Sequence, residues 1–291
     1  MWFTQNFDEY EILDTSDGEK LERWKDIILI RPDPQVIWKG VKKHPDWKNY
    51  NARYIRSSKG GGAWDIKNLS REMQENGWTE CRNGLKFLVK PTGFKHTGVF
   101  PEQAVNWDFI ADKISNAGRE ISVLNLFAYT GLATLAAAKA GARVCHVDAS
   151  KGIVAWAKQN AYLSGLSEAP IRYIVDDCKK FIEREIRRGH KYDAIIMDPP
   201  SYGRGPSGEI WKLEDGIDEL LGLVSNLVSD NPLFVLVNSY TTGLSASTVG
   251  YMMNLHFASK LGGKVTCDEI GIPVTQTGYI LPAGSSARWE I

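Results

Sequence analysis

The chain has 291 residues, 43% of them apolar, and its 35 basic and 35 acidic side chains give a formal net charge of zero. This composition is typical of a globular protein and excludes a disordered tail, a collagen-like chain and a disulfide scaffold. No apolar run approaches the roughly 20 residues that a membrane-spanning helix needs, and the N-terminal segment lacks the basic and apolar regions of a signal peptide.

The cysteines are widely spaced and form no C-x-x-C pair; they are Cys81, Cys145, Cys178 and Cys267. This spacing favours buried thiols over a zinc site or a disulfide framework, and it is typical of a reducing compartment. We therefore expect a cytoplasmic protein that holds no metal and does not enter a membrane.

Residues 1–115 predict a small β-rich domain, a candidate for substrate recognition. Apolar runs at 11–14 and 27–31 flank a turn at Asp17-Gly18, and a glycine-rich turn follows at 59–62. The segment 85–90 alternates like a half-exposed strand, and 103–117 has the pattern of a helix that leads into the next domain.

Residues 116–291 alternate short apolar runs with helical patterns. We expect strands at 121–126, 142–147, 171–175, 192–197 and 233–237, separated by helices at 132–140, 153–163, 179–188, 213–229 and 248–261. Two further runs, 264–270 and 278–281, predict an antiparallel pair at one edge. Repeated strand–helix units of this length predict a mostly parallel sheet with helices on both faces.

Polar and glycine residues follow the predicted parallel strands at their carboxyl ends, where open α/β sheets bind ligands. The first strand is followed by Gly131, which lets a ligand approach the backbone, although the turn is not G-x-G-x-x-G. Asp148 ends the second strand, where a carboxylate can accept hydrogen bonds from ribose hydroxyls. Asp176 and Asp177 follow the third strand, where a carboxylate can accept a hydrogen bond from an adenine amino group.

The fourth strand is followed by Asp198-Pro199-Pro200-Ser201-Tyr202. A lone aspartate after a strand is most often a helix cap, and a lone Pro-Pro is usually a stop signal. Signals at four consecutive strand ends are harder to explain by capping, and together they favour a nucleoside-type cofactor.

The segments 123–163, 176–182 and 193–202 resemble the S-adenosylmethionine-dependent methyltransferases, in particular the large-subunit rRNA cytosine-C5 methyltransferases and their relatives. The resemblance covers about residues 85–291. It implies an α/β fold with a Rossmann-like, seven-stranded, mostly parallel sheet whose last strand is antiparallel. It also implies S-adenosylmethionine as cofactor, contacted by Thr97, Phe100, Gln103, Phe127, Ala128, Gly131, Asp148, Ala149, Ser150, Asp177, Cys178 and Asp198.

The resemblance also implies a role for each position. Residues 127, 128 and 131 would lie against the methionine and ribose, Asp148 would hold the ribose hydroxyls, and residues 149 and 150 would lie beside the adenine. Asp177 and the Cys178 backbone would meet the adenine edge, and Asp198 would lie near the sulfonium. The segment 96–103 would fold over the cofactor; a plain linker is the alternative.

Methyl transfer from a sulfonium requires placement of the acceptor more than acid–base help. Asp198 and the carbonyl of Pro199 or Pro200 can steer an amine lone pair toward the methyl group. Tyr202 can stack on a flipped base, or it is an ordinary loop tyrosine. The glycine-rich loop 203–208 is a candidate substrate gate.

Methylation of cytosine C5 requires a cysteine thiolate that attacks C6. In the cytosine subgroup this thiol follows the fifth strand, but here the matching stretch 237–244 contains no cysteine, and neither does 198–205. The departure argues against C5 chemistry and favours a nitrogen or oxygen acceptor.

The zero net charge is a cancellation between unlike segments. Residues 1–38 carry a balance of −5, residues 39–95 a balance of +8, and the remainder −3. In the basic segment, lysines and arginines interleave with Trp38, Trp47, Tyr50, Tyr54 and Trp64, a pattern found in single-strand nucleic-acid binding. Alternatively, the aromatic rings form the domain core and the lysines its solvated face.

We predict a cytoplasmic S-adenosylmethionine-dependent methyltransferase that acts on RNA, with ribosomal RNA as the substrate and partner. One alternative is a methyltransferase of a protein or small molecule. Others are a nicotinamide-dependent oxidoreductase, which Asp148 alone would permit, and a non-catalytic RNA-binding protein. The sequence leaves the methylated atom and the oligomeric state open.

Overall fold

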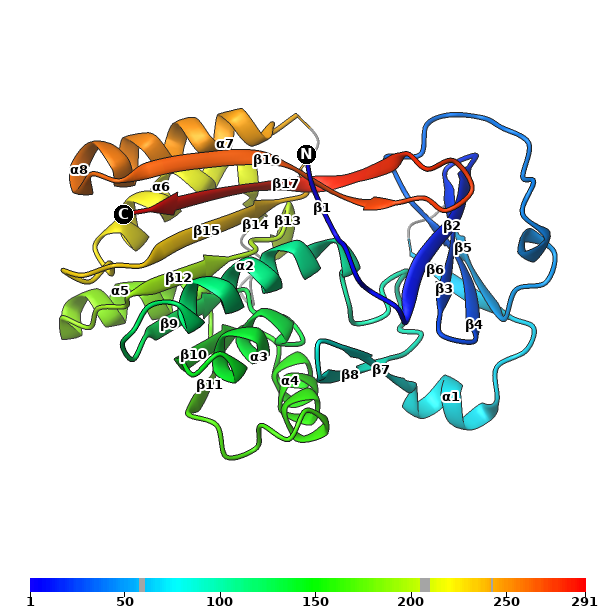
Figure 1. The fold of residues 1–291 in the computed structure, drawn as a ribbon, viewed down its shortest axis with the longest axis horizontal. Helices are drawn as coiled ribbons and strands as arrows, with labels where there is room; N and C mark the ends of the chain where they lie inside the picture. The colour runs from blue at the N-terminus through cyan, green and yellow to red at the C-terminus, as the bar shows by residue number, and fades with distance from the viewer. Residues whose placement is uncertain (58–60, 205–209, 242) are drawn as a thin grey trace. The chain divides into compact units, whose positions relative to one another are not determined.

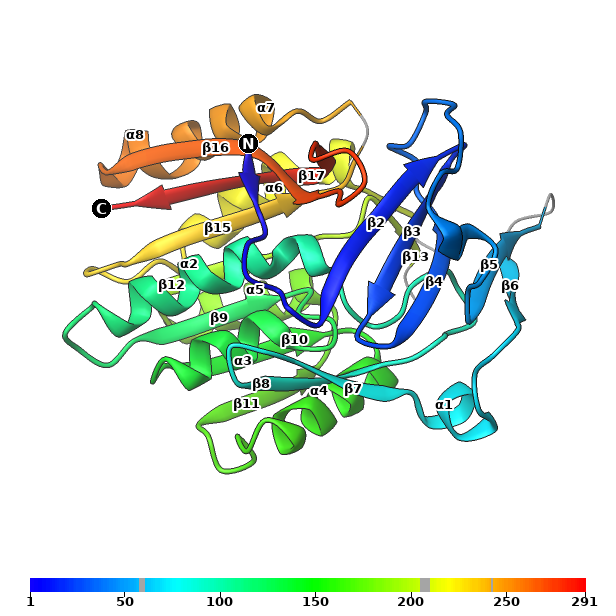
Figure 2. The same ribbon diagram turned by 45° about the vertical axis from the view of Figure 1, so that its right-hand side comes forward.

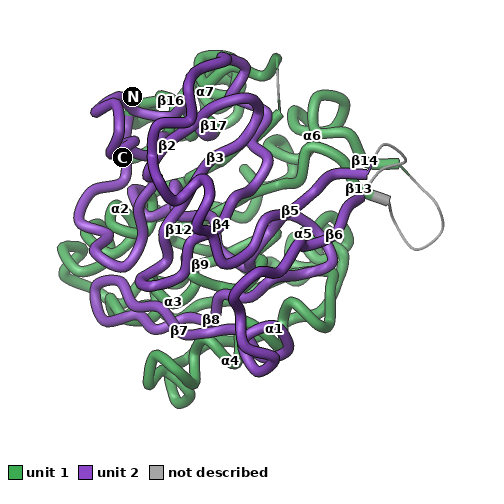
Figure 3. Tube along the Cα trace, turned by 90° about the vertical axis from the view of Figure 1, so that its right-hand side faces the viewer, with its two compact units in different colours: residues 1, 106–270, 284–291 green, residues 2–105, 271–283 purple. Residues whose placement is uncertain are grey.

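The computed structural model describes residues 1–57, 61–204, 210–241 and 243–291. The chain divides into two compact units, coloured in Figure 3. Unit 1 comprises Met1, 106–270 and 284–291, and unit 2 comprises 2–105 and 271–283. Residues 271–283 therefore return to the unit formed by the N-terminal part, and the functional division at residue 115 stays a prediction.

The larger sheet has, within the described residues, eight strands in the order β1-β16-β17-β15-β12-β9-β10-β11. The strands are β1 Trp2–Phe3, β9 Ser122–Leu126, β10 Arg143–Asp148, β11 Ile171–Val175, β12 Ala194–Met197, β15 Phe234–Ser239, β16 Lys264–Pro273 and β17 Ile280–Glu290. Strands β11, β10, β9, β12 and β15 are parallel neighbours, and β17 pairs antiparallel with β15. The predicted Rossmann-like fold is confirmed, with the two-residue β1 added at the edge of the seven implied strands.

Helices cover both faces of this sheet, as Figures 1 and 2 show. They are α2 Ala104–Ser115, α3 Leu132–Lys139, α4 Lys151–Leu163, α5 Cys178–Arg188, α6 Leu213–Ser225, α7 Ala246–Met253 and α8 Ser259–Leu261, with a π-helical turn Asn254–Ala258 between the last two. Alternate residues of each strand point to opposite faces. Leu124 and Leu126 pack with α5, α6 and α7, whereas Val123 packs with α2 and α3. Within the described residues, none of the helices combines the length and apolar character that crossing a bilayer requires.

Within the described residues, unit 2 contains a five-stranded sheet with the strand order β2-β3-β4-β5-β6. They are β2 Tyr10–Ser16, β3 Glu19–Trp24, β4 Ile27–Pro32, β5 Ala52–Arg56 and β6 Gly62–Ile66. Only β4 and β5 are parallel. Helix α1 Arg71–Asn76 precedes a hairpin of β7 Trp78–Arg82 and β8 Leu85–Val89. The expected strands near 11–14, 27–31 and 85–90 are present, and the expected turn at 59–62 lies partly outside the described residues.

Candidate active site at the carboxyl edge of the large sheet

The sheet order reverses at β9, which lies between β10 and β12. The loop after β9 has an unusual backbone: φ is +54° at Phe127, +49° at Tyr129 and +87° at Gly131. Non-glycine residues in this left-handed region cost on the order of 1–3 kcal/mol, and they persist only where the surrounding structure enforces them. Such strain clusters at ligand sites, so the switch point is the candidate site.

Three backbone N–H groups fix this loop. Phe127 donates to the Cys178 sulfur at 3.3 Å, and Ala128 donates to the carbonyl of Val147 at 3.0 Å. Tyr129 donates to Asp148 Oδ2 at 3.0 Å. The loop is therefore held by the carboxyl end of β10 and the first turn of α5.

Asp148 is half-buried, and both of its carboxylate oxygens already accept a backbone hydrogen bond. Oδ2 accepts from Tyr129, and Oδ1 accepts from the N–H of Ser150 at 2.9 Å. Burial raises the pKa of Asp148, and the two N–H donors oppose that effect. Each carboxylate oxygen has a further lone pair, so Asp148 can still accept hydrogen bonds from two hydroxyls.

Asp177 and Ser150 are the N-caps of helices. Asp177 Oδ1 accepts from the N–H of Lys180 at 2.9 Å at the start of α5, and the Ser150 hydroxyl accepts from Ile153 at 3.4 Å at the start of α4. Both side chains therefore cap helices. Their expected positions next to the adenine are a separate prediction. Cys178 occupies the first helical position, where the backbone N–H has no intrahelical acceptor.

Asp198 follows β12, which pairs with β9 through Met197 and Leu126, so Asp198 and Phe127 are neighbours at the same edge. Asp198 is half-buried, Pro199 is buried and Pro200 is exposed. Tyr202 is 52% exposed and begins β13 (Tyr202–Arg204), which pairs with β14 (Ile210–Lys212). The candidate gate at 203–208 lies partly outside the described residues.

Trp211, which the sequence analysis did not select, contributes to this edge. Its indole N–H donates to the carbonyl of Pro200 at 2.7 Å, and its ring lies over Phe127 with the ring centroids 6.5 Å apart. The Pro200 carbonyl is thus engaged, which leaves Pro199 as the better candidate for steering an amine. The only signal for Trp211 in the sequence is an aromatic residue just before the helix that starts at Leu213.

Thr97, Phe100 and Gln103 belong to unit 2, whereas the other nine expected cofactor contacts belong to unit 1. Thr97 is fully buried, and its hydroxyl has no hydrogen-bond partner. Phe100 precedes a short 3₁₀ turn, in which the Gln103 N–H donates to the Phe100 carbonyl at 3.0 Å. The expected contact of these three residues with the cofactor stays a prediction.

The thiols are poorly suited to nucleophilic attack. Burial raises the pKa of Cys145 to about 11, and burial also raises the pKa of Cys178. Cys267 lies on β16, outside the stretch 237–244 that matches the segment in which the cytosine enzymes carry their nucleophile. In the ranges that the structure describes, no group of three His, Cys, Asp or Glu side chains could hold a metal ion.

A cavity of about 670 Å³ lies at the opposite, amino-terminal edge of the sheet. Its walls include Ser122 and Arg143 at the starts of β9 and β10, together with Asp193. Because open parallel sheets bind ligands at the carboxyl edge, this cavity is a poor candidate for the cofactor site.

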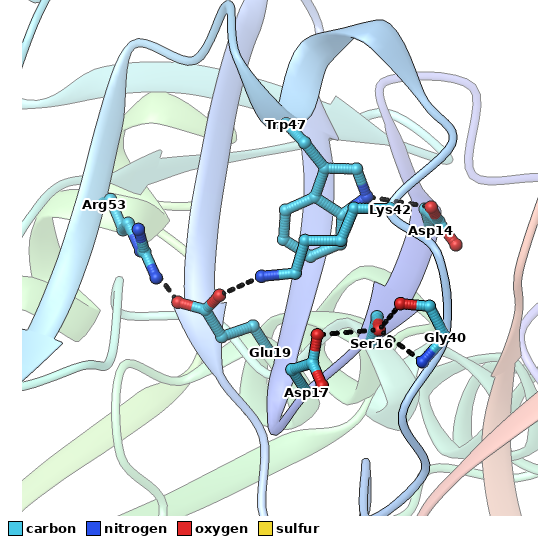
Figure 4. A network of polar contacts seen from close by, with 8 residues as sticks. All are labelled: Asp14, Ser16, Asp17, Glu19, Gly40, Lys42, Trp47 and Arg53. Carbon is cyan, nitrogen blue, oxygen red and sulfur yellow. Dashed lines mark hydrogen bonds and ion pairs between the residues drawn. The ribbon is translucent and has the colours of Figure 1, made fainter.

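Part of the basic and aromatic segment is committed to the structure of unit 2, as Figure 4 shows for Lys42, Trp47 and Arg53. Trp47 is buried, and its indole N–H donates to Asp14 Oδ2 at 2.8 Å. Lys42 and Arg53 both bind Glu19, at 2.6 Å and 2.8 Å. Part of the positive balance of residues 39–95 is therefore neutralised by the acidic segment that precedes it.

Two other rings of this segment are also structural. Tyr54 is buried against Trp64 in an edge-to-face contact, and the Trp64 N–H donates to the carbonyl of Thr92 at 2.9 Å. Trp38 is 41% exposed, although its N–H donates to the Thr15 carbonyl. The interpretation as a core therefore holds for Trp47 and Tyr54, whose rings are unavailable for stacking on bases, whereas Trp64 is only half-buried.

The strand order, the strained loop after β9 and the carboxylates at neighbouring strand ends are typical of Rossmann-like enzymes, a class that binds nucleoside cofactors at the switch point of the sheet. More narrowly, a family model described as S-adenosylmethionine-dependent methyltransferase matches residues 43–261, and the chain belongs to this family. The predicted enzyme class and cofactor are confirmed, and the nicotinamide-dependent alternative is wrong.

Solved structures agree with this assignment. The S-adenosylmethionine-dependent methyltransferase from Agrobacterium tumefaciens is 36% identical with a TM-score of 0.92, over 99% of this chain and 92% of that one. A methyltransferase crystallised with SAH, the demethylated cofactor, shares the fold at a TM-score of 0.73 and 19% identity, over 97% of this chain and 75% of that one.

Curated relatives match a smaller part of the chain. The ribosomal RNA large subunit methyltransferase K/L of Shewanella frigidimarina is 35% identical over 158 residues, which is 54% of this chain and 21% of that protein. The protein of the same name from Shewanella baltica is 31% identical over 196 residues, which is 66% of this chain and 25% of that protein. The chain thus spans about a fifth to a quarter of the length of these relatives.

Proposed function

We propose that the protein transfers a methyl group from S-adenosylmethionine to a nitrogen or oxygen atom of RNA, with ribosomal RNA as the substrate class. The observation that carries this proposal is the edge after β12, where half-buried Asp198, Pro199 and exposed Tyr202 follow one another. The names of the curated relatives support RNA as the acceptor.

The residues after β9 and β10 fit the cofactor. At Gly131 an added Cβ would lie 3.0 Å from Ala157 Cβ, so glycine lets the backbone of the loop pack closely against α4. Asp148 keeps acceptor capacity for two ribose hydroxyls, and the Cys178 N–H can donate to an adenine nitrogen. We assign Phe127, Ala128, Ala149, Ser150 and Asp177 to the same site.

When bound, S-adenosylmethionine supplies a methyl group that leaves its sulfonium sulfur as the acceptor atom attacks. Asp198 accepts a hydrogen bond from the acceptor amine, and the carbonyl of Pro199 accepts a second, so that the amine lone pair faces the methyl carbon. Tyr202 stacks on the target base, and Trp211 holds the Pro200 carbonyl and thus the backbone of this segment. In-line placement of this kind supplies most of the rate enhancement that such a displacement needs.

Cytosine C5 is excluded from the proposal because its chemistry requires a thiolate. The stretch 237–244 at the end of β15 contains no cysteine, and burial holds the Cys145 and Cys178 thiols protonated. The cytoplasmic location expected from the cysteine pattern is part of the same proposal.

The test is methyl transfer from labelled S-adenosylmethionine to ribosomal RNA from a strain that lacks the gene. We expect label in this RNA and none above background in wild-type RNA, whose sites are already methylated. Asp198→Asn should lower turnover by about 100-fold or more, as for loss of a group that acts only in the transition state. The control is Asp230→Asn, because Asp230 is an exposed carboxylate after α6. Equal label in both RNA samples would reject this substrate.

The alternative acceptor, a protein or small molecule, is tested with the same label. Incorporation into the protein fraction or the low-molecular-weight fraction of a lysate, with none in RNA, would favour it.

A further inference from the structure

Unit 2 contains a set of buried charges on β3, β4 and the segment that follows β4. Lys20 and Arg31 are cross-strand neighbours. Arg31 binds Glu22 through two nitrogens, and Lys20 binds Asp33 at 3.1 Å. All four residues are at most 9% exposed. These four charges therefore satisfy one another.

Three further polar side chains lie beside this set without a partner. Arg31 also donates to the backbone carbonyl of Lys95 at 3.1 Å, which brings Lys95 and His96 next to the buried charges. Among the described residues, the side chains of Lys95, His96 and Arg56 form no hydrogen bond or ion pair, although the His96 ring packs against Phe100 with the centroids 5.2 Å apart. Lys95 and His96 are half-buried, and Arg56 is exposed at the end of β5.

The effects of these charges on the pKa values of Lys95 and His96 agree with the placement that the Arg31–Lys95 contact gives. Burial and the charges of Lys20, Arg31 and Arg56 lower the pKa of Lys95 to about 8, although Asp33 opposes the shift. Burial and the same cations, with Lys95, lower the pKa of His96 to about 4.

Positive charge is in excess at this place. Lys20 and Arg31 are paired with Asp33 and Glu22, and the charges of Lys95 and Arg56 add to them without a paired carboxylate among the described residues. Glu102, the third acidic group nearby, is buried, and burial raises its pKa, which opposes its ionisation. An anion at Lys95 would relieve the repulsion among these cations.

A buried donor adds to this picture. The hydroxyl of Thr97, next in the chain after His96, is fully buried and has no hydrogen-bond partner. Leaving such a group unpaired costs on the order of 1–3 kcal/mol, so structures normally supply an acceptor. Ammonium, guanidinium, imidazole and hydroxyl donors together suit an anion with several oxygens.

We propose that Lys95, His96 and Arg56 bind a phosphate group, with Lys20 and Arg31 as buried supporting cations and with the Thr97 hydroxyl as a further donor, a role that replaces its expected contact with the cofactor. The guanidinium of Arg56 presents a fork that matches two phosphate oxygens, and Lys95 supplies a point charge. Resting on the function proposed above, we assign the phosphate to the backbone of the RNA substrate.

The first test observes His96 in the full chain by NMR titration, with its signal assigned through His96→Gln. A single-stranded oligoribonucleotide and inorganic phosphate are added in separate arms. Because a bound anion stabilises the protonated ring, we expect the pKa of His96 to rise by about one unit or more toward its ordinary value. His44, which lies beside Asp46 in the same unit, is the internal reference, and its NMR signal should not respond to the added ligand.

The second test measures binding of the same oligoribonucleotide by fluorescence anisotropy at several salt concentrations. Lys95→Gln and Arg56→Gln should each weaken binding by roughly 5- to 10-fold and reduce the slope of log affinity against log salt by about one. The control is Lys48→Gln, because Lys48 is an exposed lysine of the same segment whose side chain makes no ion pair among the described residues. It should change affinity by less than about twofold.

The outcomes separate this site from the proposed function. If RNA is bound and methylated while the pKa of His96 stays fixed and both variants match Lys48→Gln, the site is rejected and the function stands. If inorganic phosphate raises the pKa of His96 but RNA is neither bound nor methylated, the phosphate site stands and the RNA function fails.

Discussion

Gly131→Ala tests whether the loop after β9 holds the cofactor. With φ at +87°, alanine at this position costs about 1–2 kcal/mol in backbone strain. Its Cβ would also lie 3.0 Å from Ala157 Cβ and 3.4 Å from His146 Cε1, so α4 or the loop must move by a few tenths of an ångström. Forced packing of this kind costs on the order of 1–3 kcal/mol more.

The matched control is Gly141→Ala, at the other end of α3. Its φ is +99°, and an added Cβ would meet nothing within 4 Å, so it carries the backbone cost without the collision. At about 2–4 °C per kcal/mol for a domain of this size, Gly141→Ala should lower the melting temperature by about 2–8 °C, and Gly131→Ala should lower it further.

The assay is calorimetric titration with S-adenosylhomocysteine beside thermal unfolding. We expect Gly131→Ala to weaken binding about tenfold or more, equivalent to about 1.4 kcal/mol, and Gly141→Ala to leave it unchanged. Adding Ala157→Gly to Gly131→Ala should recover part of the lost affinity, because it removes the colliding methyl group. Wild-type affinity in Gly131→Ala, or an equal loss in both single variants, would refute the role assigned to the loop.

Three other changes have defined outcomes. Asp148→Ala removes hydrogen bonds to a charged acceptor worth about 1.5–3 kcal/mol, so S-adenosylhomocysteine should bind about 10- to 150-fold more weakly by calorimetry; unchanged affinity would remove its ribose role. Trp211→Phe keeps a ring beside Phe127 but loses the donor to Pro200, so turnover should fall several-fold while cofactor affinity holds; loss of both would indicate a general structural role. Glu80 is buried beside Glu9, and burial, with the Glu9 carboxylate, raises the pKa of Glu80 from 4.5 to about 8. The contribution of Glu80 to stability therefore falls as the pH rises from 4.5 to about 8. Glu80→Gln should raise the melting temperature more at pH 8.5 than at pH 5, and an equal rise at both pH values would contradict the raised pKa of Glu80.

The sequence predicts the central parallel strands β9, β12 and β15 well because they are buried on both faces and read as nearly continuous apolar runs, and it also predicts the partly exposed edge strand β11. The strand expected at 233–237 is observed as Phe234–Ser239, and the one at 171–175 as Ile171–Val175. Carboxylates that follow such strands can also be placed from the sequence, since parallel strands bring their carboxyl ends to one edge.

Strand β17 is longer than its apolar pattern indicates, since only 278–281 was expected and the strand continues to Glu290. Its middle is built of small polar residues with no alternation, and tertiary contacts define it. The Ser286 hydroxyl donates to Asn238 Oδ1 at 2.9 Å, and the same oxygen accepts from Asn106. A Cβ at Gly284 would lie 2.9 Å from the Tyr240 ring, so only glycine fits beside it.

Strand β3 was missed for a different reason. The strand runs from Glu19 to Trp24, and four of its six residues are charged, so its composition suggests an exposed segment. In the fold, however, the charged residues Lys20 and Glu22 are buried. Glu22 is fully buried because Arg31 binds it, and Lys20 is buried because Asp33 binds it. Pairings between residues on different strands are invisible to a pattern-based prediction, and the same limit hid Trp211.

The return of residues 271–283 to unit 2 bears on how this protein could evolve. Val274 forms a bridge with Ile12, and the N–H groups of Thr275 and Gln276 donate to the carbonyls of Ile12 and Leu13. Recombination that exchanged residues 2–105 alone would leave β2 without this partner and expose Ile12, which is fully buried. The unit cannot be gained or lost as one contiguous stretch of gene, so its two segments must be inherited together and change in concert.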